Sequence, residues 1–160
     1  MNAESPELEP FGEAADRGDP KRAFRRLLRE VASGNDDAML NLGYCYDTGV
    51  GTKPNPAKAM LCYRRAYRKG SAAAASNIAT VYRDQGKARL AFAWYLRAVL
   101  LRDGSAMLEV AKCYLYGWGV RKDLGNAAKF AQRALASEFI CEADQEEAAE
   151  ILEGMPKDAR

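Results

Sequence analysis

The sequence predicts an all-α fold, a right-handed α-solenoid in which antiparallel helix pairs stack on one another. Two observations carry this prediction. The segment from Leu42 to Gly51 returns between Val110 and Gly119, at an offset of 68 residues, with a related copy between them. Within each copy, alanine and larger apolar residues recur every four positions, the spacing of one helix face. Repeats of this length are typical of helix pairs that bury one another.

The length and composition set the broad class of protein. The chain has 160 residues, 48% of them hydrophobic, which is enough for one domain with a real core. The densest apolar stretch, Leu90 to Leu101, is interrupted by Arg97 and is too short to cross a membrane. The first 19 residues are acidic and contain no apolar signal core. We therefore expect a cytoplasmic protein with no membrane contact.

The chain divides into three expected regions. Residues 1–19 form an acidic segment with room for a short capping helix. Residues 20–137 hold about three repeats, preceded by a half repeat that runs from Pro20 to Gly34. Residues 138–160 supply a capping helix and tail, because an apolar stripe alternates with glutamates from Ser137 to Gly154 before Pro156 stops the helix.

Each copy is expected to form two helices. Gly34, Gly70 and Gly104 are predicted to end second helices in a left-handed cap, and Pro54 and Pro56 to help start one. The stripe of the first helices consists of Ala38, Leu42 and Tyr46, then Ala74, Ile78 and Tyr82, then Ala106, Val110 and Tyr114. The stripe of the second helices consists of Ala59, Tyr63 and Ala66, then Ala91, Tyr95 and Ala98, then Ala127, Ala131 and Ala134.

The turns between the helices carry a more specific pattern. The first copy reads Leu42-Gly43, Tyr46, Gly49 and Gly51, and the third reads Gly117-Trp118-Gly119-Val120. This pattern resembles the Sel1-like repeats, relatives of the tetratricopeptide repeat. The middle copy lacks the Gly-x-Gly turn and is more similar to a tetratricopeptide repeat. The resemblance covers about residues 20–137.

The resemblance implies a function as well as a fold. In the tetratricopeptide family the first helices line a concave groove that grips peptides or domains, so another protein or a peptide is the expected partner. Trp118 is expected to pack over its turn rather than to anchor a partner, and Trp94 to lie in the core. The groove positions, mapped copy by copy, are Asn41, Tyr44 and Asp47, then Asn77, Thr80 and Arg83, then Glu109, Lys112, Leu115 and Tyr116.

The cysteines are expected to be packing residues. None of the four lies in a C-x-x-C pair, and the chain has no histidine, so neither a structural zinc site nor another metal or cofactor is predicted. Cys45 and Cys113 share a repeat position that the middle copy fills with Val81. An apolar residue at the equivalent position argues for burial and against a disulfide framework.

The chain inventory favours binding over catalysis. Without histidine the usual general base is missing, and no nucleophile or phosphate-binding motif is present, so we expect no enzyme activity. The sequence predicts an adaptor or scaffold. One alternative is an immunity or inhibitor protein that blocks a toxin or effector, a role that some bacterial Sel1-like proteins fill. The sequence defines neither the partner nor the oligomeric state.

Charge provides a second, less favoured alternative. Residues 20–102 carry sixteen bases against five acids, a charge of +11, between acidic segments of −5 (residues 1–19) and −4 (residues 103–160). Basic stripes on convex second helices are a pattern that can track nucleic-acid phosphates, but no aromatic base-stacking pattern accompanies them. The stripes consist of Lys21, Arg22, Arg25, Arg26 and Arg29, and of Arg64, Arg65, Arg68 and Lys69.

Overall fold

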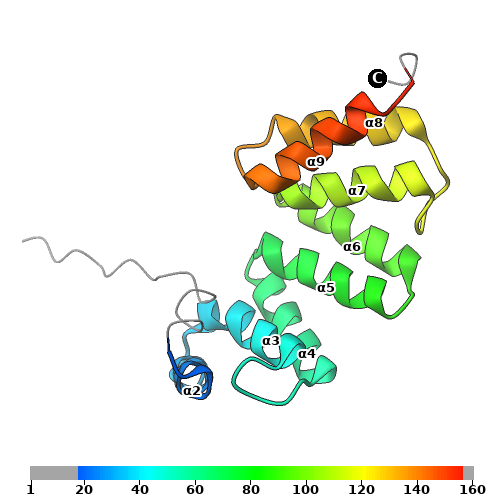
Figure 1. The fold of residues 1–160 in the computed structure, drawn as a ribbon. Helices are drawn as coiled ribbons and strands as arrows, with labels where there is room; N and C mark the ends of the chain where they lie inside the picture. The colour runs from blue at the N-terminus through cyan, green and yellow to red at the C-terminus, as the bar shows by residue number, and fades with distance from the viewer. Residues whose placement is uncertain (1–17, 157–160) are drawn as a thin grey trace, which may run out of the picture. The chain divides into compact units, whose positions relative to one another are not determined.

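The computed structural model describes residues 18–156 as helices joined by short turns, with no strand in that range (Figure 1). The all-α prediction is confirmed. The helices are α2 (Pro20–Ala32), the 3-10 helix η1 (Asp36–Ala38), α3 (Met39–Thr48), α4 (Pro56–Arg68), α5 (Ala72–Asp84), α6 (Ala88–Leu100), α7 (Gly104–Tyr116), α8 (Leu124–Leu135) and α9 (Glu142–Glu153). Between residues 18 and 156, none of these helices has the length and apolar character needed to span a membrane.

The chain forms two compact units, residues 1–66 and residues 67–160. In the first unit, α2 packs on η1 and α3. In the second, α5 pairs with α6 and α7 with α8, and α7 also contacts both α6 and α9 (Figure 1). The second unit therefore stacks helix pairs as the repeat predicts.

The predicted stripes are the positions that the structure buries. Of the eighteen stripe residues, all are buried except Tyr46, Tyr82 and Tyr114, which are partly buried. Those three tyrosines occupy one repeat position and pack against the cores of their own units. Small alanines beside each large residue let neighbouring backbones approach closely, so the interior is filled without long side chains.

Side-chain oxygens fix the helix starts. Each N-cap residue accepts a hydrogen bond from a backbone N–H of the first turn, which satisfies one of the donors that a helix leaves open. Pro56 follows its cap as the first residue of α4, as predicted. The capping residues are Asp19, Asn55, Ser71, Asp103 and Asp123.

The helix ends confirm two of the three predicted glycine caps. Gly34 and Gly70 follow α2 and α4 with φ angles of +92° and +91°. The prediction for Gly104 was wrong, because Gly104 is the first residue of α7 and Arg102 holds the left-handed position, with φ +66°. The middle copy is four residues shorter, so the position equivalent to Gly70 lies 32 residues on, at Arg102.

Gly104 is required for a different reason. A Cβ there would overlap the backbone carbonyl of Phe139, to which the Gly104 N–H donates a hydrogen bond of 3.0 Å. The closing helix α9 accordingly starts at Glu142 rather than at Ser137, and Phe139 lies in the connection, 64% exposed. The short helix expected in the acidic N-terminal segment falls outside the described residues.

Candidate functional site

The Gly-x-Gly turns have the same geometry in both units. All four of their glycines have φ between +71° and +84°. A Cβ on Gly51 would lie 2.7 Å from the carbonyl carbon of Pro20, and one on Gly119 would lie 2.5 Å from the carbonyl carbon of Ala88. Pro20 and Ala88 are themselves 68 residues apart and begin α2 and α6. Helix α2 thus stands in its unit where the preceding second helix stands in the other.

The third-copy turn presents an aromatic pair. Trp118, between the two glycines, is 50% exposed, and Tyr116, at the end of α7, is 55% exposed. Their ring centroids are 4.8 Å apart. The expectation that Trp118 packs over the turn is therefore incomplete, because half of its surface faces solvent and its ring contacts that of Tyr116. The first copy has Val50 at the same position.

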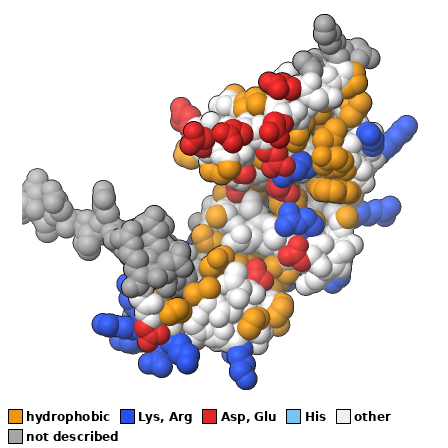
Figure 2. Space-filling view, viewed as in Figure 1, with side chains coloured by type: hydrophobic (Ala, Val, Ile, Leu, Met, Phe, Trp, Pro, Cys, Tyr) orange, Lys and Arg blue, Asp and Glu red, His pale blue; other side chains and the backbone are white. Residues whose placement is uncertain are grey.

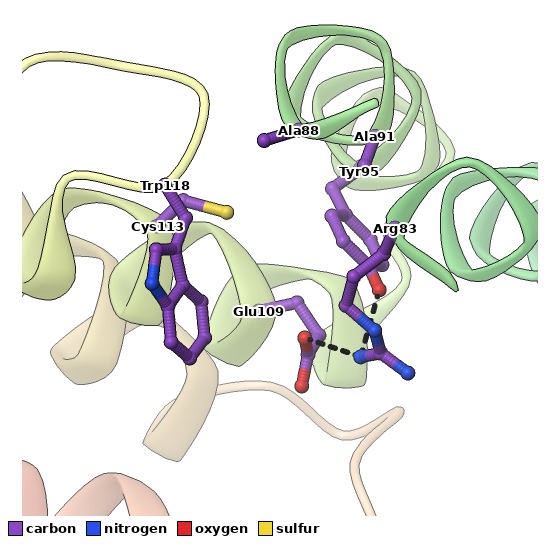
Figure 3. A pocket seen from close by; sticks show the side chains of 7 residues that line it. All are labelled: Arg83, Ala88, Ala91, Tyr95, Glu109, Cys113 and Trp118. Atoms are coloured by element: carbon purple, nitrogen blue, oxygen red, sulfur yellow. Dashed lines mark hydrogen bonds and ion pairs between the residues drawn. The ribbon is translucent and has the colours of Figure 1, made fainter. Parts of the chain in front are cut away.

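Trp118 forms one wall of a hollow of about 250 Å³. In Figure 3, Trp118 and Arg83 stand on opposite sides, and Glu109 lies between them. One guanidinium nitrogen of Arg83 lies 3.2 Å from the Tyr95 hydroxyl and 3.2 Å from a Glu109 carboxylate oxygen. The full lining is Arg83, Ala88, Ala91, Tyr95, Glu109, Cys113 and Trp118.

A second hollow, of about 310 Å³, lies beside α9 and shares two boundaries with the first. The Tyr116–Trp118 pair is one boundary, since Tyr116 lines the second hollow. The other is Lys112, whose Nζ lies 2.7 Å from Glu109 and 2.9 Å from Glu147. The second lining is Leu115, Tyr116, Glu147, Glu150, Ile151, Gly154 and Met155. We call the two hollows with the aromatic pair and Lys112 the α7 surface.

The ion pairs of the α7 surface hold both cations in their charged forms. Burial alone would lower the pKa of Lys112, but hydrogen bonds to Glu109 and Glu147 raise it above its ordinary value. Burial likewise opposes the charge of Arg83, and the neighbouring Tyr95 and Glu109 raise the pKa of Arg83. Both cations are therefore already engaged by carboxylates of the protein.

The acidic character of this surface comes from α9. Figure 2 shows acidic side chains gathered over this helix, which has no basic residue. Glu147 pairs with Lys112, whereas Glu150 forms no salt bridge with any residue between 18 and 156. The acidic residues of α9 are Glu142, Asp144, Glu146, Glu147, Glu150 and Glu153.

The predicted groove residues are divided between the two units. In the second unit, Arg83, Glu109, Leu115 and Tyr116 line the α7 surface, and Lys112 lies at its centre. Asn77 and Thr80 are partly buried on α5 and line neither hollow; Thr80 lies 3.4 Å from the Tyr95 hydroxyl. In the first unit, Tyr44 is 44% exposed, whereas Asn41 and Asp47 are partly buried.

A tyrosine tie explains the varied chemistry at one groove position. The Tyr63 hydroxyl donates to Asp47 across 3.2 Å. In the middle copy Tyr95 and Arg83 form the equivalent contact. The third copy replaces the tyrosine with Ala131 and the polar partner with Leu115, which lies against the apolar cluster that includes Met155. The tie is lost as a pair, and the vacated polar position becomes an apolar lining residue.

Sequence reasoning missed part of the site. Trp118 was not among the predicted binding residues, and α9 was expected only to close the array. Glu147, Glu150 and Met155 therefore went unnoticed. The signal that was available was the change from Val50 to Trp118 at an otherwise repeated turn. Trp94, by contrast, packs as expected: its ring lies 5.0 Å from that of Tyr67 and beneath the Arg97 guanidinium.

The buried cysteines act as packing residues. Cys45 and Cys113 are buried, and burial raises the pKa of each thiol to about 11. Both therefore stay protonated at neutral pH, whereas nucleophilic thiols need a lowered pKa. All four cysteines are free thiols in the structure. Residues 18–156 bring together no group of three or more side chains suited to a metal ion.

Comparison with protein families decides the relationship. The model of the Sel1 repeat matches residues 36–71, 79–103 and 104–138. The chain belongs to the Sel1 repeat family. Sel1 repeats generally mediate protein–protein interaction. The middle Sel1 match is the shortest, and it lies in the copy that lacks the Gly-x-Gly turn.

Two solved structures share the Sel1 fold. A Sel1 repeat protein from Oxalobacter formigenes has a TM-score of 0.66 and 25% identity, over 79% of this chain and 52% of that chain. A protective antigen present in uropathogenic Escherichia coli strains, c5321, displays an SLR fold and matches with a TM-score of 0.71 and 26% identity. That match covers 87% of this chain and 31% of the antigen.

A curated mouse protein shares a shorter segment. The DAP3-binding cell death enhancer 1 of Mus musculus is 30% identical over 64 residues, which is 40% of this chain and 12% of that protein. The chain thus spans a small part of this relative and about half or less of the two solved proteins.

Proposed function

We propose that this Sel1 repeat protein is a non-catalytic adaptor or scaffold that binds a protein or peptide segment at the α7 surface. The observation that carries the proposal is the exposed Tyr116–Trp118 pair between two hollows. Tyrosine and tryptophan contribute much of the energy at protein interfaces, because each buries a large rigid area and keeps a polar group for hydrogen bonding.

The arrangement around the pair supports recognition rather than chemistry. Apolar surface at Ala88, Ala91 and Leu115 lies beside fixed charges at Arg83 and Glu109, which is the mixture found at interface cores and rims. Ion pairs hold these charges in place before any partner arrives, so little side-chain entropy is lost on binding.

The first unit supplies a second candidate contact. Tyr44 is exposed on α3, with Asn41 one helical turn away on the same helix. We propose that these side chains contribute to partner binding separately from the α7 surface. Asp47 has a different role in the free protein, because it accepts the Tyr63 hydroxyl.

The proposal is tested by affinity capture from native cells with the tagged full chain, followed by mass spectrometry. The informative comparison is with a Tyr116→Ala, Trp118→Ala double variant, because both side chains are half exposed and their removal should leave the helices intact. Leu100→Ala is the matched control, since Leu100 is 82% exposed on α6 and lines neither hollow. We expect partners that the wild type and Leu100→Ala retain and that the double variant loses. Equal capture by all three proteins would refute binding at the α7 surface.

A further inference from the structure

Resting on the proposed function, we propose that the segment bound at the α7 surface is a basic peptide with one large apolar anchor. The anchor enters the hollow beside Trp118, and the cationic side chains face Glu147 and Glu150. Two independent features support this assignment: the shape and lining of the first hollow, and the charge that remains once the internal ion pairs are counted.

The first hollow fits one side chain. Its volume of about 250 Å³ lies below the range of pockets that hold drug-sized ligands. The small residues Ala88 and Ala91 form one side, and the buried thiol of Cys113 and the indole of Trp118 form the other (Figure 3). An aromatic or branched aliphatic side chain fills such a site and is stabilised by ring contact with Trp118.

The charges of the surface disfavour an acidic ligand. The guanidinium of Arg83 is engaged by Glu109 and Tyr95. The ammonium of Lys112 is held by two carboxylates. An incoming carboxylate would therefore have to displace a partner that is already in place, and the displaced group would lose its counter-charge.

The same count favours a basic ligand. Asp84, Glu109, Glu147 and Glu150 supply four negative charges to this face against the two cations, a formal balance of −2. Glu150 lines the second hollow and forms no salt bridge within residues 18–156. A lysine or arginine that follows the anchor along the second hollow would pair with Glu150 without breaking an existing bond.

The test is a selection from a random peptide display library on the immobilised full-length protein. We expect the enriched peptides to combine an aromatic or branched aliphatic residue with lysine or arginine. The best peptide, synthesised with a fluorescein label, is then titrated by fluorescence anisotropy. Trp118→Ala should weaken binding at least about tenfold, as truncation of an interface anchor does.

A pair of charge variants tests the basic half of the proposal. Glu150→Gln should weaken binding about threefold at low ionic strength, and the difference should shrink as salt is added. Glu146→Gln is the matched control, since it makes the same change on α9 outside both hollows and should have a smaller effect.

Each contrary outcome has a distinct meaning. Enrichment of acidic peptides, or of peptides whose affinity survives Trp118→Ala, overturns the inference and leaves the proposed function standing. A dimer in light scattering that Trp118→Ala dissociates shows instead that a second copy occupies the surface. No enrichment at all also overturns the inference, and the affinity capture described above then decides whether the proposed function fails with it.

Discussion

Replacement of Gly119 by alanine should destabilise the second unit through two separate effects. The first is backbone strain, because φ at Gly119 is +73°, a conformation that costs a non-glycine residue about 1–2 kcal/mol. The second is steric overlap, since the new Cβ would lie 2.5 Å from the Ala88 carbonyl carbon and 2.9 Å from the Arg89 nitrogen. Relief of such overlap by backbone movement costs about 1–3 kcal/mol.

Gly86→Ala is the matched control for the strain. Gly86 lies in the turn between α5 and α6 of the same unit, with φ +71°, and a Cβ at this position would meet no other atom within 4 Å. Its replacement should therefore cost only about 1–2 kcal/mol. The difference between the two variants isolates the overlap between the third-copy turn and the start of α6.

The assay is urea denaturation followed by far-ultraviolet circular dichroism. We expect the free energy of unfolding to fall by about 2–4 kcal/mol for Gly119→Ala, with the excess over Gly86→Ala between about 1 and 3 kcal/mol. Equal losses for the two variants would refute the close packing of Gly119 on Ala88. Gly51→Ala tests the same contact in the first unit.

Three further predictions concern charge, thiols and strain. The free energy of unfolding should fall as pH rises from 9.0 toward 11, because the unfolded chain releases the protons of Cys45 and Cys113 before the folded chain does; Cys113→Ala should reduce this dependence in denaturation curves measured across that range. A double-mutant cycle of Lys112→Met and Glu147→Gln should give a coupling energy of about 1 kcal/mol, with faster hydrogen exchange in α9 in each variant. Arg102→Gly should stabilise the fold by about 0.5 kcal/mol in urea denaturation, because relief of strain at φ +66° exceeds the entropy that glycine adds to the unfolded chain.

The outcomes that would contradict these three predictions are equally direct. A free energy of unfolding that stays constant to pH 11 would show that the two thiols are not desolvated. Strict additivity of the Lys112 and Glu147 variants would show that the bridge between α7 and α9 contributes nothing. A loss of stability in Arg102→Gly would show that the arginine side chain contributes more than its backbone strain costs.

The fold was predictable because burial in this chain follows one period. Residues four apart on a helix share a face, so Ala74, Ile78 and Tyr82 were readable as one stripe before any coordinates existed. Helix ends were less predictable, because they depend on register. Gly104 looked like a cap by residue type alone, and only the shorter middle copy moves that role to Arg102.

The candidate site was predictable only where it repeats. Arg83, Glu109, Leu115 and Tyr116 came from positions that recur in every copy, and the structure brings them to one surface. Contacts made outside the repeat carry no periodic signal. The bond from Lys112 to Glu147 spans 35 residues into the closing helix, and no spacing rule for a helix surface reaches that far.

The Gly-x-Gly turn separates the stability of the chain from what the chain displays. The backbone path is fixed by the two glycines, so the residue between them is free to vary without new strain. In one copy that residue is Val50, packed against its own unit, and in the other it is Trp118, half in water. A lineage of such proteins can thus acquire or discard a recognition side chain by a single substitution, and the helices on either side need not adapt.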